Sequence, residues 1–506
     1  MTADLAALAA AFAEGRTTEA QALFGQAYER RKADADGLLA LAGLAETAGL
    51  GDLALRTAIA ARALAFDRAD LHMRVADLCR AQGRLVEADD AYRAAIQRGA
   101  DASAARALAE IATGTVAMPG LGPVAFALAP GVATLTRPGA AGRALVSFYR
   151  APVLLADDHP ALGFQSAYLD TREVCRILLG RGFDLDVVDL DGDAIPPGDA
   201  YGLVFGVHGD LARHRGRAAP GARLVQWMTG RHPEVQNAAE SARIEALLAR
   251  RGGSYAPKRQ IDRVEAELES IGIADRGILI GNRATLATYP EAWRAKIALV
   301  PVCAGRIRAP KPRERLVPAE REFLWLNSFG AVLKGLDLAI EAVLADERLV
   351  LNIVGLIDRE EDFVALYRDA LFGHPRIRRH GYLATDSPRF QAIADRCAAF
   401  LLPSASEGMS GSAATCLQLG LFPIVSRESG IDLPAGSGRY LETCAIEEIG
   451  GAMAEVMTMP AEALAAATAV CQRQALALYS RTATTRRLDG IFGELLGGTR
   501  PAQPPP

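Results

Sequence analysis

The sequence lacks the features that define several common protein classes. Its seven cysteines are scattered and no two form a Cys-x-x-Cys pair, which argues against a disulfide framework and a cysteine-held zinc ion. Neither sign of charge is in excess, since 56 lysines and arginines stand against 60 aspartates and glutamates. Charge alone would not hold a polyanion, so we expect no nucleic-acid partner. The sequence also has no P-loop and no catalytic triad with convincing spacing.

Long apolar runs of the kind that cross membranes are also missing. Met1 is not followed by a basic region, and Glu14 and Arg16 interrupt the apolar stretch behind it, so we expect no signal peptide. Residues 111–136 carry no charge, but their prolines and glycines would break a helix. We predict a linker or hairpin at 113–142, with strands at 124–128 and 132–136. We therefore expect no transmembrane segment and a cytoplasmic protein, with peripheral membrane contact left open.

The first hundred residues repeat with a period of 34. Gly15, Gly49 and Gly83 share one column of the repeat, and alanines fill two others. Small residues let two helices approach closely, and glycine suits a left-handed turn between them. The period resembles the tetratricopeptide repeat, so we predict an all-α domain at 1–112, with three repeats and a capping helix at 103–112. Such a stack offers a groove to a protein partner; packing against the next domain or self-association is the alternative.

From residue 144 onward, short β-rich apolar runs alternate with helical patterns, which is typical of parallel sheets covered on both faces. We predict two Rossmann-like lobes, an N-terminal lobe at 143–310 and a C-terminal lobe with a closing helix at 311–498, followed by a disordered tail at 499–506. A Pro- and Arg-rich break at 303–322 separates them. Loops at the carboxyl ends of both sheets would then face each other across a cleft. Within the first lobe we predict a helix at 234–251.

The second lobe carries residues suited to a diphosphate. Lys334 supplies positive charge, and Ser410, Gly411 and Ser412 begin a helix whose free amides favour phosphate. Gly408 and Gly411 would let the main chain approach a ligand closely. Glu407 follows a strand, where its carboxylate can hold sugar hydroxyls. Taken singly, a lysine before a helix is often only solvated and a Glu-Gly pair is often only a turn, but their order and spacing together favour a site.

The segments at 327–337, 402–408 and 419–425 resemble, in this order, the C-terminal lobe of GT-B glycosyltransferases of the large retaining family 4. The resemblance covers roughly residues 144–496 and is strongest in the second lobe. It implies a metal-independent, hexosyltransferase-type enzyme with no cofactor and a nucleotide-sugar donor as substrate. It also implies that Glu407 contacts the transferred sugar, and that the main chain around Gly381 and Tyr382 meets the base.

The sequence departs from the family pattern at two places. Thr415 stands where the family has a second glutamate for the ribose, and a hydroxyl bonds ribose without charge assistance. Residues 329–333 lack the arginine that often precedes the lysine. In the first lobe, by resemblance, the loop at Gly163 would cover the donor phosphates and His208 would contact the donor sugar; as a lone histidine, it could equally be a polar surface residue. Residues 229–232 are a weaker acceptor candidate.

We therefore expect a glycosyltransferase that moves a sugar from a nucleotide-sugar donor to a protein or glycan acceptor recruited partly by the repeats. The alternative is a degenerate transferase-fold scaffold or adaptor whose repeats bind a protein partner. Residues 189–193 look like the start of a calcium loop, but its twelfth position is Ala200 rather than glutamate, so we predict a turn and no metal site.

Overall fold

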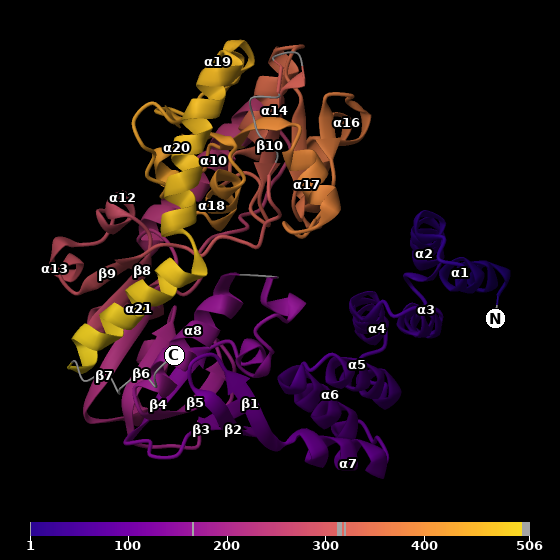
Figure 1. The fold of residues 1–506 in the computed structure, drawn as a ribbon, viewed down its shortest axis with the longest axis vertical. Coiled ribbons are helices and arrows are strands. Elements are labelled where there is room, and N and C mark those ends of the chain that lie inside the picture. Colours follow the sequence, from indigo (N-terminus) through magenta and orange to yellow (C-terminus); the bar gives the residue numbers. More distant parts are fainter. Residues whose placement is uncertain (1, 164–165, 311–315, 318–319, 498–506) are drawn as a thin grey trace. The chain divides into compact units, whose positions relative to one another are not determined.

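A computed structural model gives the fold of residues 2–163, 166–310, 316–317 and 320–497 (Figure 1). The predicted tail at 499–506 and most of residues 311–319 lie outside these described residues. The chain divides into two compact units: residues 1–162 with 178–198, and residues 163–177 with 199–506. No helix of the described residues is long and apolar enough to cross a membrane.

The N-terminal part of the first unit is built of helices, as predicted. They are α1 (Ala3–Ala13), α2 (Thr17–Arg31), α3 (Ala35–Thr47), α4 (Gly51–Leu64), α5 (Ala69–Ala81), α6 (Leu85–Gln97) and α7 (Ala102–Ile111). Gly15, Gly49 and Gly83 each join two helices of a hairpin, with φ values of 68°, 74° and 71°. The alanines of the repeat columns are buried between the helices, and the Tyr92 hydroxyl donates to Asp77 at 2.7 Å. Because the glycines adopt positive φ, each hairpin turns within a few residues.

Strands follow the helices and extend the first sheet. The strands β1 (Thr113–Met118), β2 (Gly122–Ala129) and β3 (Val132–Thr136) form an antiparallel meander. β3 then pairs antiparallel with β5 (Phe183–Asp189), which runs parallel to β4 (Gly142–Phe148). The residues predicted as a hairpin therefore form part of a sheet. Asp189 ends β5 and accepts from the Arg150 Nε at 2.8 Å, consistent with a turn at 189–193.

The second unit holds two sets of parallel strands. One consists of β6 (Tyr201–Val207), β7 (Ala218–Met228), β8 (Arg276–Ile280) and β9 (Ile297–Val300). The other has the order β12-β11-β10-β13-β14-β15, with β10 (Glu322–Leu326), β11 (Leu351–Val354), β12 (Ile377–Arg379), β13 (Cys397–Leu402), β14 (Phe422–Ser426) and β15 (Arg439–Leu441). In both sets the strands read as apolar runs because helices cover them on both faces.

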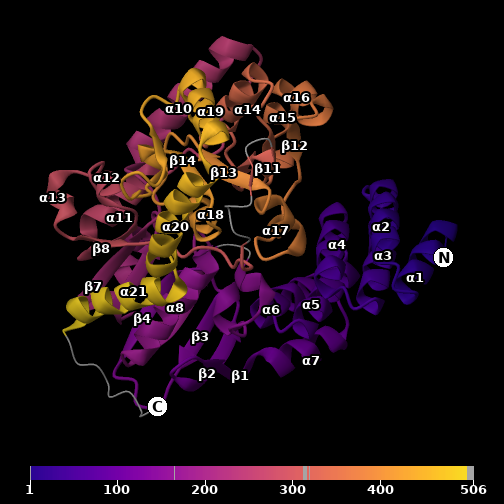
Figure 2. The same ribbon diagram turned by 45° about the horizontal axis from the view of Figure 1, so that its top comes forward.

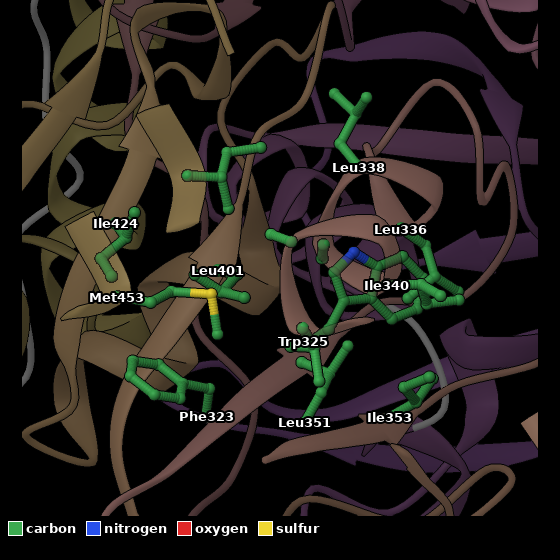
Figure 3. Packing of buried hydrophobic residues seen from close by; sticks show 14 of the residues in the cluster. Phe323, Trp325, Leu336, Leu338, Ile340, Leu351, Ile353, Leu401, Ile424 and Met453 are labelled. Atoms are coloured by element: carbon green, nitrogen blue, oxygen red, sulfur yellow. The ribbon is translucent and has the colours of Figure 1, made fainter. Parts of the chain in front are cut away.

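The core of the second sheet packs strand side chains against helices α14 (Leu336–Ala345) and α19 (Ile446–Thr458). Figure 3 shows Phe323 and Trp325 of β10 beside Leu351 and Ile353 of β11, with Met453 of α19 nearby. The loops of this lobe also carry α17 (Pro388–Ala394) and α18 (Gly411–Gln418). Two short helices, α15 (Glu361–Leu366) and α16 (Arg368–Gly373), meet at Tyr367. The Tyr367 ring stacks on Phe363 and its hydroxyl donates to Glu341 at 3.0 Å.

Helix α10 (Pro233–Arg251) does not pack where the sequence predicted. It begins at the end of β7, yet Ile244 and Leu247 join the buried cluster of the second lobe. Figures 1 and 2 both draw it among α14 and α19. Arg250 pairs with Asp337 of α14 at 2.6 Å. The prediction that this helix completes the first lobe is therefore wrong, because its apolar stripe is buried against the other sheet's helices.

The C-terminal helices lead the chain from the second set of strands back to the first, whereas α10 leads from the first set to the second. Helix α20 (Ala461–Leu478) packs on α18, and α21 (Arg481–Leu496) returns to the first set of strands. Arg487 of α21 donates to the Leu299 carbonyl of β9 at 3.0 Å, and Glu494 pairs with Arg276 of β8 at 2.7 Å. Each half of the second unit is thus covered by a helix that the sequence order assigns to the other half.

Candidate active site

Lys334 and Glu407 lie together after adjacent strands of the second sheet. Lys334 belongs to the loop after β10 and Glu407 to the loop after β13, and these strands pair in parallel. The Lys334 ammonium donates to the Glu407 carboxylate, and the two side chains are 9% and 14% exposed. The structure therefore brings together the two residues that the sequence singled out most strongly. The opposite charges of the two side chains cancel within this pair.

The buried carboxylate of Glu360 fixes the loop that carries Lys334 through hydrogen bonds to its main chain. Glu360 accepts from the Gly330 N–H at 2.6 Å and from the Ala331 N–H at 3.1 Å. Its other oxygen accepts from the Tyr255 hydroxyl at 2.6 Å. Because Glu360 and Tyr255 are buried, this network fixes the loop before any ligand arrives. Burial and the nearby Glu360 carboxylate raise the pKa of Tyr255, so its hydroxyl stays a donor.

Helix α18 presents two main-chain amides that have no partner among the described residues, those of Gly411 and Ser412. Ser410 is its N-cap, with a side chain that accepts from the Ala413 N–H at 3.3 Å. The Ser410 amide itself donates to the Ser429 carbonyl at 3.1 Å, so this N–H is not available to a phosphate. The Ser412 hydroxyl donates to the Asn327 side chain at 3.0 Å, linking the helix to the loop after β10. Free amides at a helix start are suited to bind an anion.

Gly408 lies in close contact with main chain from the first set of strands. A Cβ at this position would lie 2.4 Å from the Thr229 carbonyl oxygen and 2.5 Å from that of Ile280. The Gly408 carbonyl also accepts from the Thr285 hydroxyl at 2.7 Å. Close approach to main chain at the ends of β7 and β8 therefore requires glycine here, and its predicted contact with a ligand stays a prediction. It also places the 407–410 loop against the carboxyl ends of the other strands.

Thr415 is buried and its hydroxyl is already engaged. It donates to the Gly411 carbonyl at 2.8 Å and accepts from the Gly305 N–H at 2.9 Å. Its side chain therefore joins the segment after β9 to α18. The hydroxyl proton is used, so an approaching ribose could only donate to the remaining lone pair.

Gly381 and Tyr382 follow β12, which ends at Arg379. The Gly381 carbonyl accepts from the Gly355 N–H at 3.0 Å, which places this loop beside the end of β11. The Tyr382 side chain is 46% exposed. Gly163 is exposed and ends a 3-10 turn at Pro160–Gly163, while residues 164–165 of its loop lie outside the described residues.

His208 stands in a strained position at the end of β6. Its φ is 52°, which is uncommon for any residue but glycine. The Gln226 side chain donates to its carbonyl at 2.8 Å, and its Nδ1 lies 3.3 Å from the Glu267 carboxylate of α11 (Val264–Ile273). Strain that neighbours hold in place often marks a functional site. Glu267 was missed in the sequence because its contact with His208 spans 59 positions.

His232, by contrast, lies in a packed environment. Its ring stacks on Trp293 with centroids 6.3 Å apart and meets Tyr289 edge-on at 5.6 Å. It is 7% exposed, and its main-chain N–H donates to the Thr288 hydroxyl. This residue supports the start of α10. Among the described residues, no group of three or more His, Cys, Asp or Glu side chains could hold a metal ion.

Comparisons with known proteins establish the fold. No family model and no curated protein matches the chain. Sucrose-phosphate synthase from Thermosynechococcus elongatus superposes with a TM-score of 0.52 at 14% identity, over 70% of this chain and 99% of that one. HepE from Anabaena in complex with UDP-glucose gives a TM-score of 0.44 at 12% identity, over 59% and 79% of the two chains. TarM gives 0.42 at 11% identity, over 57% and 54%. The chain therefore has the GT-B glycosyltransferase fold, with an all-α N-terminal region before it, and the predicted fold class is confirmed.

Proposed function

We propose that this chain is a glycosyltransferase that moves a sugar from a nucleotide-diphosphate donor to an acceptor. The observation that carries the proposal is the meeting of Lys334, Glu407 and the free amides of Gly411 and Ser412 beside paired strand ends. An ammonium and main-chain N–H groups stabilise the charge that builds on a departing diphosphate. No metal is needed for this step if these donors suffice.

The other predicted residues take roles around this centre. Glu407 would hold hydroxyls of the transferred sugar once the diphosphate occupies Lys334. His208, fixed by Gln226 and Glu267, would contact the same sugar from the first set of strands. The loop at Gly381 and Tyr382 would receive the base, and that at Gly163 would cover the phosphates. We carry over the retaining family 4 assignment and a hexosyl donor as parts of the proposal.

The helical N-terminal region would recruit a protein or glycan acceptor, and we propose that the enzyme acts in the cytoplasm. Tetratricopeptide-like hairpins support recruitment, because stacked helical pairs expose a continuous surface. A groove on α3, α5 and α7 has a volume of about 650 Å³ and is lined by Leu39, Met73, Asp77 and Asp101, among others. Its three aspartates outnumber its one arginine, Arg74, and together with its apolar side chains they suit a basic segment with apolar side chains.

A scaffold without transferase activity is the second candidate. The engaged hydroxyl of Thr415 favours it, because the residue in the place of the family's ribose-binding glutamate faces protein instead. Thermal shift and donor hydrolysis with UDP-, GDP- and CMP-sugars separate the two. We expect one nucleotide sugar to stabilise the wild-type chain, the Lys334→Ala variant to lose that shift, and Arg473→Ala, an exposed control, to keep it. Absence of any shift and any hydrolysis would favour the scaffold.

A further inference from the structure

The charge of the site raises a problem that Lys334 alone does not solve. Its ammonium is paired with Glu407, so the pair is neutral. A diphosphate is an anion, and binding it in a partly buried place needs an additional cation. Two nearby arginines each have a partner: the Arg243 Nη2 donates to the Pro403 carbonyl at 2.8 Å, and the Arg231 Nη1 lies 3.9 Å from Glu428.

Arg259 lies across the loop that carries Lys334. A Cβ built on Gly330 would lie 2.5 Å from the Arg259 Cγ and 3.1 Å from its Cδ. Gly330 has a φ of 89°, and only a residue without a side chain leaves room for the arginine stem. Since the Lys334 N–H donates to the Gly330 carbonyl at 3.0 Å, Arg259 and Lys334 flank a single turn of main chain.

The main chain of Arg259 is held in place, while its guanidinium is exposed. Its N–H donates to the buried Glu240 carboxylate at 2.9 Å, and its carbonyl accepts from the Gln236 amide at 2.7 Å. Both partners lie on the first turns of α10. The neighbouring Lys258 is paired with Asp362 at 2.6 Å, whereas the Arg259 guanidinium has no partner among the described residues.

A series of contacts links Arg259 to the loops that carry Lys334 and Glu407. The 407–408 loop touches Thr229, and Gly230 approaches the Gln236 side chain, with 3.2 Å from a built Cβ to Oε1. Gln236 bonds Arg259, and Arg259 covers Gly330. Gly330 begins the turn that ends at Lys334, and the Lys334 ammonium donates to the Glu407 carboxylate.

We infer that Arg259 supplies the second cation for the donor diphosphate, an inference that rests on the proposed function. A guanidinium presents parallel N–H groups that match two phosphate oxygens, and it keeps its charge at any physiological pH. Arg259 lies in the segment that follows α10, whereas the arginine of the family pattern lies in the loop just before the lysine. The absence of an arginine at 329–333 is thereby offset by a residue about 70 positions upstream.

Calorimetric titration of the full chain with UDP, GDP and ADP tests whether Arg259 binds the diphosphate. The matching nucleosides, uridine, guanosine and adenosine, are titrated separately for comparison. For the diphosphate that binds best, we expect Arg259→Gln to weaken affinity about tenfold, as for loss of one charge-assisted contact, and Arg259→Lys to weaken it less. Affinity for the nucleoside should not change, and Arg473→Ala should behave as wild type. Circular dichroism checks that each variant is folded.

The outcomes distinguish the inference from the function on which it rests. If the wild type binds a diphosphate and both Arg259 variants bind it equally well, the second-cation role is wrong while the proposed function stands. If affinity for the nucleoside falls as much as that for the diphosphate, Arg259 acts on the fold instead of on phosphate. If the wild type binds none of the three, the proposed function and this inference fail together.

Discussion

Replacing Glu407 by glutamine should tighten the binding of a nucleoside diphosphate while it lowers sugar transfer. The Glu407 carboxylate pairs with the Lys334 ammonium and neutralises it, so a phosphate must compete with this carboxylate. Two anionic groups about 5 Å apart at an effective dielectric constant of about 20 repel each other by roughly 3 kcal/mol. Both side chains keep some solvent contact and the ammonium can serve both anions, so we expect a net gain of about 1–2 kcal/mol. This corresponds to roughly 5- to 30-fold tighter binding.

Calorimetric titration of the Glu407→Gln chain with the preferred diphosphate measures this change, and turnover of the nucleotide sugar measures the loss. Glu494→Gln is the matched control, because the Glu494 carboxylate on α21 pairs with Arg276 of β8 and its side chain is 60% exposed. Glu407→Gln leaves the Lys334 ammonium without its anionic partner, which destabilises the fold. The titrations should therefore be run well below the unfolding temperature of this variant. Equal or weaker diphosphate binding by Glu407→Gln would show that the carboxylate does not compete for Lys334 in solution.

Three further outcomes are expected. His208→Asn should lower turnover roughly tenfold to a hundredfold without changing diphosphate affinity, because the ring would contact only the sugar; a matching loss of affinity would contradict this. Burial, with the Glu173 carboxylate nearby, raises the pKa of Asp170 to about 7, so the folded chain holds this proton more tightly than the unfolded chain and loses stability as pH rises from about 4 to about 7. Asp170→Asn should therefore raise the melting temperature at pH 8 but not at pH 4, as calorimetry at both pH values would show. Gly49→Ala, at φ 74°, should cost about 1 kcal/mol of unfolding free energy, whereas Gly43→Ala in the middle of α3 should gain about 0.5–1 kcal/mol, and denaturant titration would separate them.

The elements of the fold were predictable because their patterns are local. Parallel strands read as short apolar runs, and the glycines at 15, 49 and 83 mark turns that need positive φ. The destination of α10 was not predictable from the same information. Periodicity shows that Ile244 and Leu247 share one face of a helix, but it does not say which sheet that face will meet.

Some contacts of the candidate site could also be predicted from the sequence, and others depend on the fold. Lys334 and Glu407 could be paired from the sequence, because loops after adjacent parallel strands lie at one edge of the sheet. Glu267, Glu360 and Arg259 could not, since each acts on a residue brought near only by the fold. Each of them is a charged residue on a helix or loop, a pattern that by itself indicates only a solvated surface. Thr415 was recognised as a departure, but its use inside the protein depends on a Gly305 contact 110 positions away.

The packing of α10 on the second sheet's helices limits how far the two sets of strands can separate. A hinge at 303–322 that separated the two sets of strands would expose Ile244, Leu247 and Tyr255, at a cost of roughly 5–8 kcal/mol for three such side chains. It would also part Arg250 from the buried Asp337, which adds about 3–5 kcal/mol. A change on the order of 10 kcal/mol would populate the open state only about once in ten million molecules. For the proposed reaction we therefore expect the donor to exchange with α10 in place, by movement of the strand-end loops at 330–334 and 407–410 rather than by separation of whole lobes.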